Sequence, residues 1–182
     1  MEKKLVTVYK NKIKKELQNE LKLKSIYEAP DIEKISINMG FGKFKDNKDF
    51  VEEAKNDLAA ISGQEPLKRL ATKSISNFKL REGELIGYTV TLRGVRAWDF
   101  LEKLIKVVLP SVRDFRGISR KAFDGKGNFS LGIKEHFVFP EINADKVKYI
   151  KSLQVNIKTT SMADSWSEKM LESLGFPFKG KK

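Results

Sequence analysis

The chain has 182 residues, 40% of them hydrophobic and 33% charged, which favours a single globular domain spanning residues 1–182. It contains no cysteine, which excludes disulfides, thiolate nucleophiles and cysteine-based zinc sites. It contains one histidine, which leaves little scope for metal or triad chemistry. The net charge of +12 favours nucleic acid or an anionic membrane surface as the partner.

Neither a membrane span nor a secretory signal is expected. The longest unbroken apolar run covers only residues 58–61, whereas a membrane helix needs about 20 apolar residues. The N-terminal residues are charged and include no apolar stretch typical of a signal peptide. The expected location is therefore the cytoplasm.

The first half of the chain alternates between helical and strand patterns. Apolar residues recur every three or four positions in residues 4–23, which predicts a basic amphipathic helix within the segment 1–27. Alternation over residues 33–38 predicts a strand, followed by a glycine-rich turn at 39–42. A helix is then expected from a cap at Asp46 or Asn47 to Gly63, and a short strand at 67–71.

The second half continues this mixture after a polar, exposed loop at residues 73–83. Strands are expected at residues 85–92, 129–133 and 153–157, and helices at 98–108, stopped by Pro110, and at 163–174, with an irregular segment at 111–127. Interspersed strands and helices predict an α+β fold. We expect a mostly antiparallel sheet with helices packed on one face and an open face for a partner.

Three short patterns are typical of catalytic or ligand-binding sites, but each is incomplete. Gly40-Phe41-Gly42 lacks the third glycine of a phosphate-binding loop, because position 45 is Lys, and a tight turn is favoured. Residues 124–128 lack the distant Glu of a calcium loop, so a glycine turn is favoured. No nucleophile motif accompanies His136. We therefore expect no catalytic residue, no metal and no cofactor.

The basic residues are concentrated in patches. All seven Arg lie between Arg69 and Arg120, and the segment 1–27 carries eight Lys against three Glu. A lysine-rich helix is often only a solvated face, and it also suits a membrane surface. The alternatives at this point are a basic membrane-surface protein, a general RNA-binding module, and an enzyme acting on RNA.

The loop at residues 73–83 mixes cations, hydroxyls, an amide and a lone Phe78, which suits a segment that follows a sugar–phosphate backbone. A plain flexible loop is the alternative. Since no apolar pattern holds this loop, we expect it to be mobile without RNA. Polar residues at strand and helix ends add donors and acceptors, although Thr is also simply common in strands: Asn38, Gln64, Thr89, Thr91 and Arg93.

Several longer segments carry a family resemblance. Ile35–Gly42, Gly63–Pro66 and Lys73–Gly83 resemble the large-subunit ribosomal protein five family, which binds 5S rRNA. The resemblance continues, in the same order and with similar spacing, through further segments: Ile86-Gly87, Val90–Gly94, Arg113–Gly117, Asp124–Asn128, Phe139–Ile142, Thr159-Thr160 and Gly175–Phe178.

The resemblance implies a non-enzymatic, ribosome-bound protein that helps to attach 5S rRNA in the central protuberance of the large subunit. Its implied partners are 5S rRNA, other 5S rRNA-binding large-subunit proteins, P-site tRNA and small-subunit ribosomal protein thirteen, with 23S-type rRNA as a further candidate and no membrane. The resemblance implies that Asn38, Gln64, Thr91 and Arg93 face 5S rRNA. We also expect 5S rRNA contacts at neighbouring positions and on the basic helix: Met39, Gly40, Thr89, Lys10 and Lys14. The implied tRNA contacts are Lys73, Ser74, Asn77, Phe78, Lys79 and Arg81, and the implied intersubunit bridge involves Arg113 and Arg116.

Overall fold

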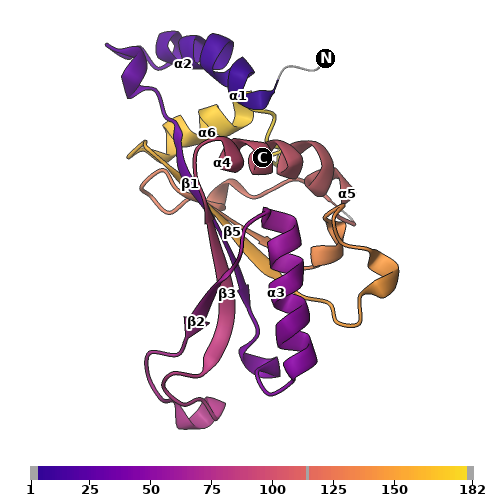
Figure 1. The fold of residues 1–182 in the computed structure, drawn as a ribbon. Helices are drawn as coiled ribbons and strands as arrows, with labels where there is room; N and C mark the ends of the chain where they lie inside the picture. Colours follow the sequence, from indigo (N-terminus) through magenta and orange to yellow (C-terminus); the bar gives the residue numbers. More distant parts are fainter. Residues whose placement is uncertain (1–3, 114, 180–182) are drawn as a thin grey trace. The chain divides into compact units, whose positions relative to one another are not determined.

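The computed structural model describes residues 4–113 and 115–179, and it confirms the α+β class (Figure 1). The described strands form a five-stranded antiparallel sheet in the order β2-β3-β1-β5-β4. Their bounds are β1 Ile32–Gly40, β2 Leu67–Leu70, β3 Leu85–Leu92, β4 Phe129–Ile133 and β5 Leu153–Thr159.

The helices are joined by several short turns. The α-helices are α1 Leu5–Val8, α2 Lys14–Glu20, α3 Lys48–Ser62, α4 Val95–Lys103, α5 Leu109–Ser111 and α6 Asp164–Ser173. Two π-helical segments continue these helices: η1 Tyr9–Ile13 joins α1 to α2, and η5 Leu104–Val108 joins α4 to α5. The 3₁₀ turns are η2 Ile26–Glu28, η3 Gly42–Phe44, η4 Ser76–Phe78, η6 Arg120–Ala122, η7 His136–Val138 and η8 Ala144–Lys146. Among the described residues, every helix is too short or too polar to cross a membrane.

The chain divides into two compact units, which we describe separately. Unit 1 comprises residues 1–35, 92–131 and 156–182, and unit 2 comprises residues 36–91 and 132–155. That the chain acts as one domain stays a prediction.

In unit 1, the apolar stripe of the first helix packs into a core, as its periodicity predicts. Tyr9, Ile13 and Leu17 are buried, and the Tyr9 ring lies 4.7 Å from that of Trp98. The Tyr9 hydroxyl donates a hydrogen bond to the carbonyl of Pro30, and burial raises the pKa of this phenol well above its usual value. The apolar side of the first helix is thus occupied by the protein itself.

In unit 2, helix α3 forms at the predicted place for the predicted reasons. The Asn47 side chain accepts a hydrogen bond from the Phe50 amide at 3.1 Å, and Gly63 ends the helix in the left-handed conformation with φ of 65°. Phe50, Ala54 and Leu58 are buried on one face of the helix. Figure 1 shows α3 lying along one side of the strands of this unit.

Two predicted boundaries are wrong. Met39 and Gly40 belong to β1 rather than to a turn, because the Phe41 amide still pairs with the Ile86 carbonyl at 3.0 Å. The helix predicted to stop at Pro110 continues to Ser111. Pro110 has no backbone N–H to donate within the helix. The π-helical segment η5 precedes it, and the Ser111 hydroxyl donates to the Val107 carbonyl at 2.7 Å. The altered hydrogen-bond spacing accommodates the proline.

Candidate nucleic-acid interface

One face of the unit 2 strands carries polar side chains, while the other carries the core. In β1, Ile37 and Met39 are buried, whereas the alternate residues Ser36 and Asn38 are half-buried and Gly40 is exposed. In β3, Thr91 is likewise half-buried. Since side chains alternate between faces along a strand, Asn38 and Thr91 lie on faces that the buried apolar residues do not occupy. They are accessible to a partner.

Met39 and Thr89 differ from these residues. The Met39 side chain is 1% exposed and belongs to the core. Thr89 is 7% exposed, and its hydroxyl donates to the Ile37 carbonyl at 3.1 Å. The implied RNA contacts of these two residues remain untested predictions, but their side chains already have partners inside unit 2.

Strand β2 adds a basic residue to this face that pattern reasoning did not assign. Arg69 pairs with Gly87 and Leu67 pairs with Thr89 in antiparallel register. Residues directly opposite each other in a ladder point to the same face of the sheet. Arg69 therefore lies on the same face as Gly87 and Thr89, and it is exposed. Only the strand register, which the sequence does not state, reveals this position.

The close approach of β1 and β3 at Gly87 gives a prediction about this face. A Cβ at Gly87 would lie 2.9 Å from the Met39 carbonyl oxygen, whereas a Cβ at Gly132 has no heavy atom within 4 Å. We expect Gly87→Ala to reduce the free energy of unfolding by about 1–3 kcal/mol, as overpacking does, and Gly132→Ala to change it by less than about 0.5 kcal/mol. Urea unfolding of both variants measures the difference. Equal free energies of unfolding for the two variants would show that β1 and β3 can move apart at Gly87 without loss of stability.

The loop at residues 73–83 is exposed along most of its length and has a regular internal structure. Lys73, Asn77 and Arg81 are exposed, and Phe78 is 73% exposed. Ile75 and Leu80 exchange backbone hydrogen bonds of 2.9 and 3.1 Å around η4. The Ser74 hydroxyl accepts from the Glu82 amide at 2.9 Å. These contacts within the loop are polar, and its mobility in the absence of RNA stays a prediction.

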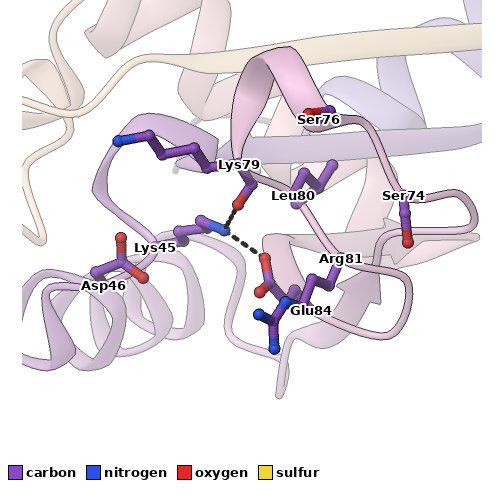
Figure 2. Close-up of a pocket in the computed structure, with 8 residues that line it drawn as sticks. All are labelled: Lys45, Asp46, Ser74, Ser76, Lys79, Leu80, Arg81 and Glu84. Carbon is purple, nitrogen blue, oxygen red and sulfur yellow. Dashed lines mark hydrogen bonds and ion pairs between the residues drawn. The ribbon is translucent and has the colours of Figure 1, made fainter.

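Lys45 connects this loop to the segment before α3 (Figure 2). Its ammonium group donates to the Lys79 carbonyl and to the Glu84 carboxylate, and its side chain is only 12% exposed. The hydrogen bond from Lys45 lowers the pKa of Glu84 below its usual value. These residues border an open pocket of about 680 Å³ that Ser74, Ser76 and Arg81 also line. In the sequence, Lys45 stands out only as the residue that breaks the glycine pattern.

The other basic candidates lie in unit 1. Lys10 is exposed, whereas Lys14 has an 18% exposed side chain whose ammonium lies 3.5 Å from the Asp31 carboxylate. Arg93 is exposed, as are Arg113 and Arg116 of the implied bridge.

Arg93 also contributes to the electrostatics around Glu33. Lys158 lies 2.7 Å from the Glu33 carboxylate. This hydrogen bond is the main cause that lowers the pKa of Glu33, and the charge of Arg93 adds a smaller effect.

His136 lies in a buried charge cluster of unit 2. Its ring is fully buried, its Nδ1 accepts from the Lys151 amide at 3.2 Å, and its Nε2 lies 3.2 Å from the Asp57 carboxylate. The Lys151 ammonium lies 2.8 Å from Asp57 and 3.1 Å from Glu53. Burial raises the pKa of Asp57, but His136 and Lys151 outweigh this effect and lower it below its usual value. Lys151 pairs with both carboxylates inside unit 2, which indicates a structural role for these three groups. The buried Nε2 of His136 lies near Asp57 but has no hydrogen-bond partner among the described residues.

Residues 124–128 form the predicted glycine turn. Asp124 accepts the amides of Lys126 and Asn128 at 2.8 and 3.0 Å, and Asp164 accepts those of Gly125 and Gly127 at 3.0 and 2.7 Å. The Asn128 side chain is the main cause that lowers the pKa of Asp124. The carboxylates therefore serve to order the backbone of this turn.

Comparison with known proteins gives matches along nearly the whole chain. Residues 25–81 match the family model described as Ribosomal protein L5, and residues 85–178 match the one described as ribosomal L5P family C-terminus. The chain is 49% identical over 171 residues to "Large ribosomal subunit protein uL5" of Buchnera aphidicola, covering 94% of this chain and 96% of that protein. It is 47% identical over 178 residues to the protein of the same name from Colwellia psychrerythraea, covering 98% of each.

Proposed function

The chain belongs to the ribosomal protein L5 family, and from this premise we propose that it is a structural protein of the large ribosomal subunit that binds 5S rRNA. The names of its relatives support the assignment to the large subunit. The observation that favours RNA as the ligand is the partly exposed polar face of unit 2, where the half-buried Asn38 and Thr91 alternate with buried apolar residues. Such amide and hydroxyl groups suit the 2′-hydroxyls and phosphates of a folded RNA.

We further propose two separate contact regions outside that face. The exposed loop at residues 73–83 contacts P-site tRNA, since it combines cations and hydroxyls with the exposed aromatic ring of Phe78. Arg113 and Arg116 contact small-subunit ribosomal protein thirteen at an intersubunit bridge. Both are exposed arginines, which suit a charged protein interface. Other 5S rRNA-binding proteins and 23S-type rRNA are the remaining proposed neighbours.

Salt-dependent binding tests the 5S rRNA assignment. We expect the affinity of the full chain for 5S rRNA to fall steeply as salt rises, because each neutralised phosphate releases counterions. Replacing the exposed lysines Lys10, Lys12 and Lys15 with Ala should reduce the salt slope by about one per lysine that contacts a phosphate. Lys14 is left in place, since its pairing with Asp31 supports the fold. Filter binding over a salt series measures the slope.

A matched control separates helix contacts from net charge. Replacing the exposed lysines Lys48, Lys134 and Lys148 of unit 2 removes the same charge and should leave most of the slope unchanged. Equal slopes in all three proteins would show that the first helix is only a solvated face. Binding to anionic vesicles without binding to 5S rRNA would overturn the RNA assignment and favour the membrane-surface alternative.

A further inference from the structure

Lys45 lies outside the loop at residues 73–83, yet its charge is directed into that loop. Its side chain is only 12% exposed, which is unusual for a lysine because burying an ammonium group is costly unless it is paired and hydrogen-bonded. Its two partners are the Lys79 carbonyl in the loop and the Glu84 carboxylate directly after the loop (Figure 2). The hydrogen-bonding capacity of Lys45 is therefore directed inward.

The backbone at Lys79 needs such support. Its φ of 48° lies in the left-handed region, and Lys22 is the other non-glycine residue with positive φ in the described parts of the chain. This conformation is strained for a residue with a Cβ. It ends η4 and reverses the chain, so that Leu80 returns to pair with Ile75. The hydrogen bond from Lys45 to the Lys79 carbonyl stabilises this turn.

The same turn determines where the cationic side chains of the loop lie. In Figure 2 the Lys79 side chain extends away from the Lys45 ammonium, while the Lys79 carbonyl points toward it. The side chains of Lys79 and Arg81 are exposed. Backbone and side chain of Lys79 thus have separate roles, one in holding the loop and one at its surface.

We propose that Lys45 is a positioning residue for RNA recognition, which fixes the turn at Lys79 so that the loop presents Lys79 and Arg81 to the phosphates of a bound RNA. Lys45 does this without touching the RNA. A loop already held in its binding conformation loses less conformational entropy on binding, which increases affinity. This inference rests on the proposed contact of the loop with tRNA.

The positioning role is tested first without RNA, by NMR-detected amide hydrogen exchange of the full chain. We expect Lys45→Met to accelerate exchange at Lys79 and Leu80 by about tenfold or more, since a charge-assisted hydrogen bond is lost. Exchange at Leu58 in α3 should stay unchanged. Lys48→Met, which removes an exposed lysine at the start of α3, is the matched control and should leave the loop amides unaffected.

The second measurement is retention of P-site tRNA by ribosomes assembled with each variant. A variant whose loop is shortened to a glycine-containing turn defines the full defect. We expect Lys45→Met to approach that defect, and Lys45→Arg to restore retention because a guanidinium can donate to both acceptors. Binding of 5S rRNA should be the same in all of these proteins.

The results distinguish the positioning role of Lys45 from the tRNA contact of the loop. Unchanged loop exchange in Lys45→Met would overturn the positioning role, and a defective loop-shortened variant would then leave the tRNA contact standing. Faster exchange with normal tRNA retention would overturn it as well, because the held conformation would not matter for binding. Normal retention with the shortened loop would overturn the tRNA contact itself, and with it the role of Lys45.

Discussion

Replacing Lys151 with Met should reduce the free energy of unfolding by about 3 kcal/mol, since this removes the buried cation that Glu53 and Asp57 share. The Lys151 side chain is 2% exposed, whereas those of Glu53 and Asp57 keep 30% and 21% exposure. The partial solvation of the carboxylates places the expected loss at the lower end of the range for buried pairs. Chemical denaturation followed by circular dichroism measures it.

The loss should depend on pH in a defined direction. The pKa of Asp57 is lowered in the folded chain, so its ionised form contributes stability above its ordinary pKa of 3.8, and this contribution disappears as the pH falls through the lowered value. The difference between parent and variant should therefore be largest at neutral pH and narrow below about pH 4. Lys148→Met, an exposed lysine of the same unit, is the control, with an expected change within about 0.5 kcal/mol. A loss below about 1 kcal/mol for Lys151→Met would contradict the structural role of the cluster.

Replacing Arg93 with Ala should weaken 5S rRNA binding by roughly 1.5–3 kcal/mol, equivalent to about 10- to 150-fold in affinity. The Arg93 side chain is exposed and only a minor influence on Glu33, so its removal should leave the unfolding transition nearly unchanged. Arg93→Lys keeps the charge but loses the planar fork, and it should recover only part of the affinity. Filter binding at fixed salt measures all three proteins.

Two companion variants show whether this effect is specific. Arg116→Ala removes the same charge from an exposed position proposed for the bridge, and it should bind 5S rRNA nearly as well as the parent. Thr91→Val keeps the shape of the side chain but removes its hydroxyl, so folding should survive while affinity falls. If Thr91→Val binds like the parent, Thr91 is only a strand former. If Arg93→Ala and Arg116→Ala lose affinity equally, the effect is one of net charge.

Much of the fold could be predicted from the sequence because it follows from local patterns. The stripe of Tyr9, Ile13 and Leu17 is buried as its helical spacing predicts. Asn47 and Gly63 begin and end α3 because a side-chain acceptor and a left-handed glycine satisfy helix ends locally. The family resemblance is of the same kind, since it depends on the order of residues alone. These features need no information about distant parts of the chain.

The two boundaries that were predicted wrongly depend on hydrogen bonds that the apolar pattern does not show. Met39 and Gly40 read as a turn, yet they are strand residues because β3 continues to pair beyond them. Pro110 was expected to end the helix, yet the π-helical segment η5 and the Ser111 hydroxyl allow the helix to include it. The deciding hydrogen bond comes from another strand at Met39 and Gly40, and from four residues away in the same helix at Pro110.

The sequence by itself therefore determined most of the secondary structure, the basic character and the family of this protein, whereas only the tertiary structure decided which polar side chains remain accessible. Thr89 and Thr91 are alike in sequence, but the hydroxyl of Thr89 is bound to the Ile37 carbonyl, 52 positions away. Lys45 and Lys151 are two of many lysines, and their carboxylate partners lie 39 and more than 90 positions away in the chain. A charged side chain stabilises the fold when folding pairs it with an opposite charge away from water. Its partner can lie anywhere in the chain, so local sequence patterns do not show which lysines are paired.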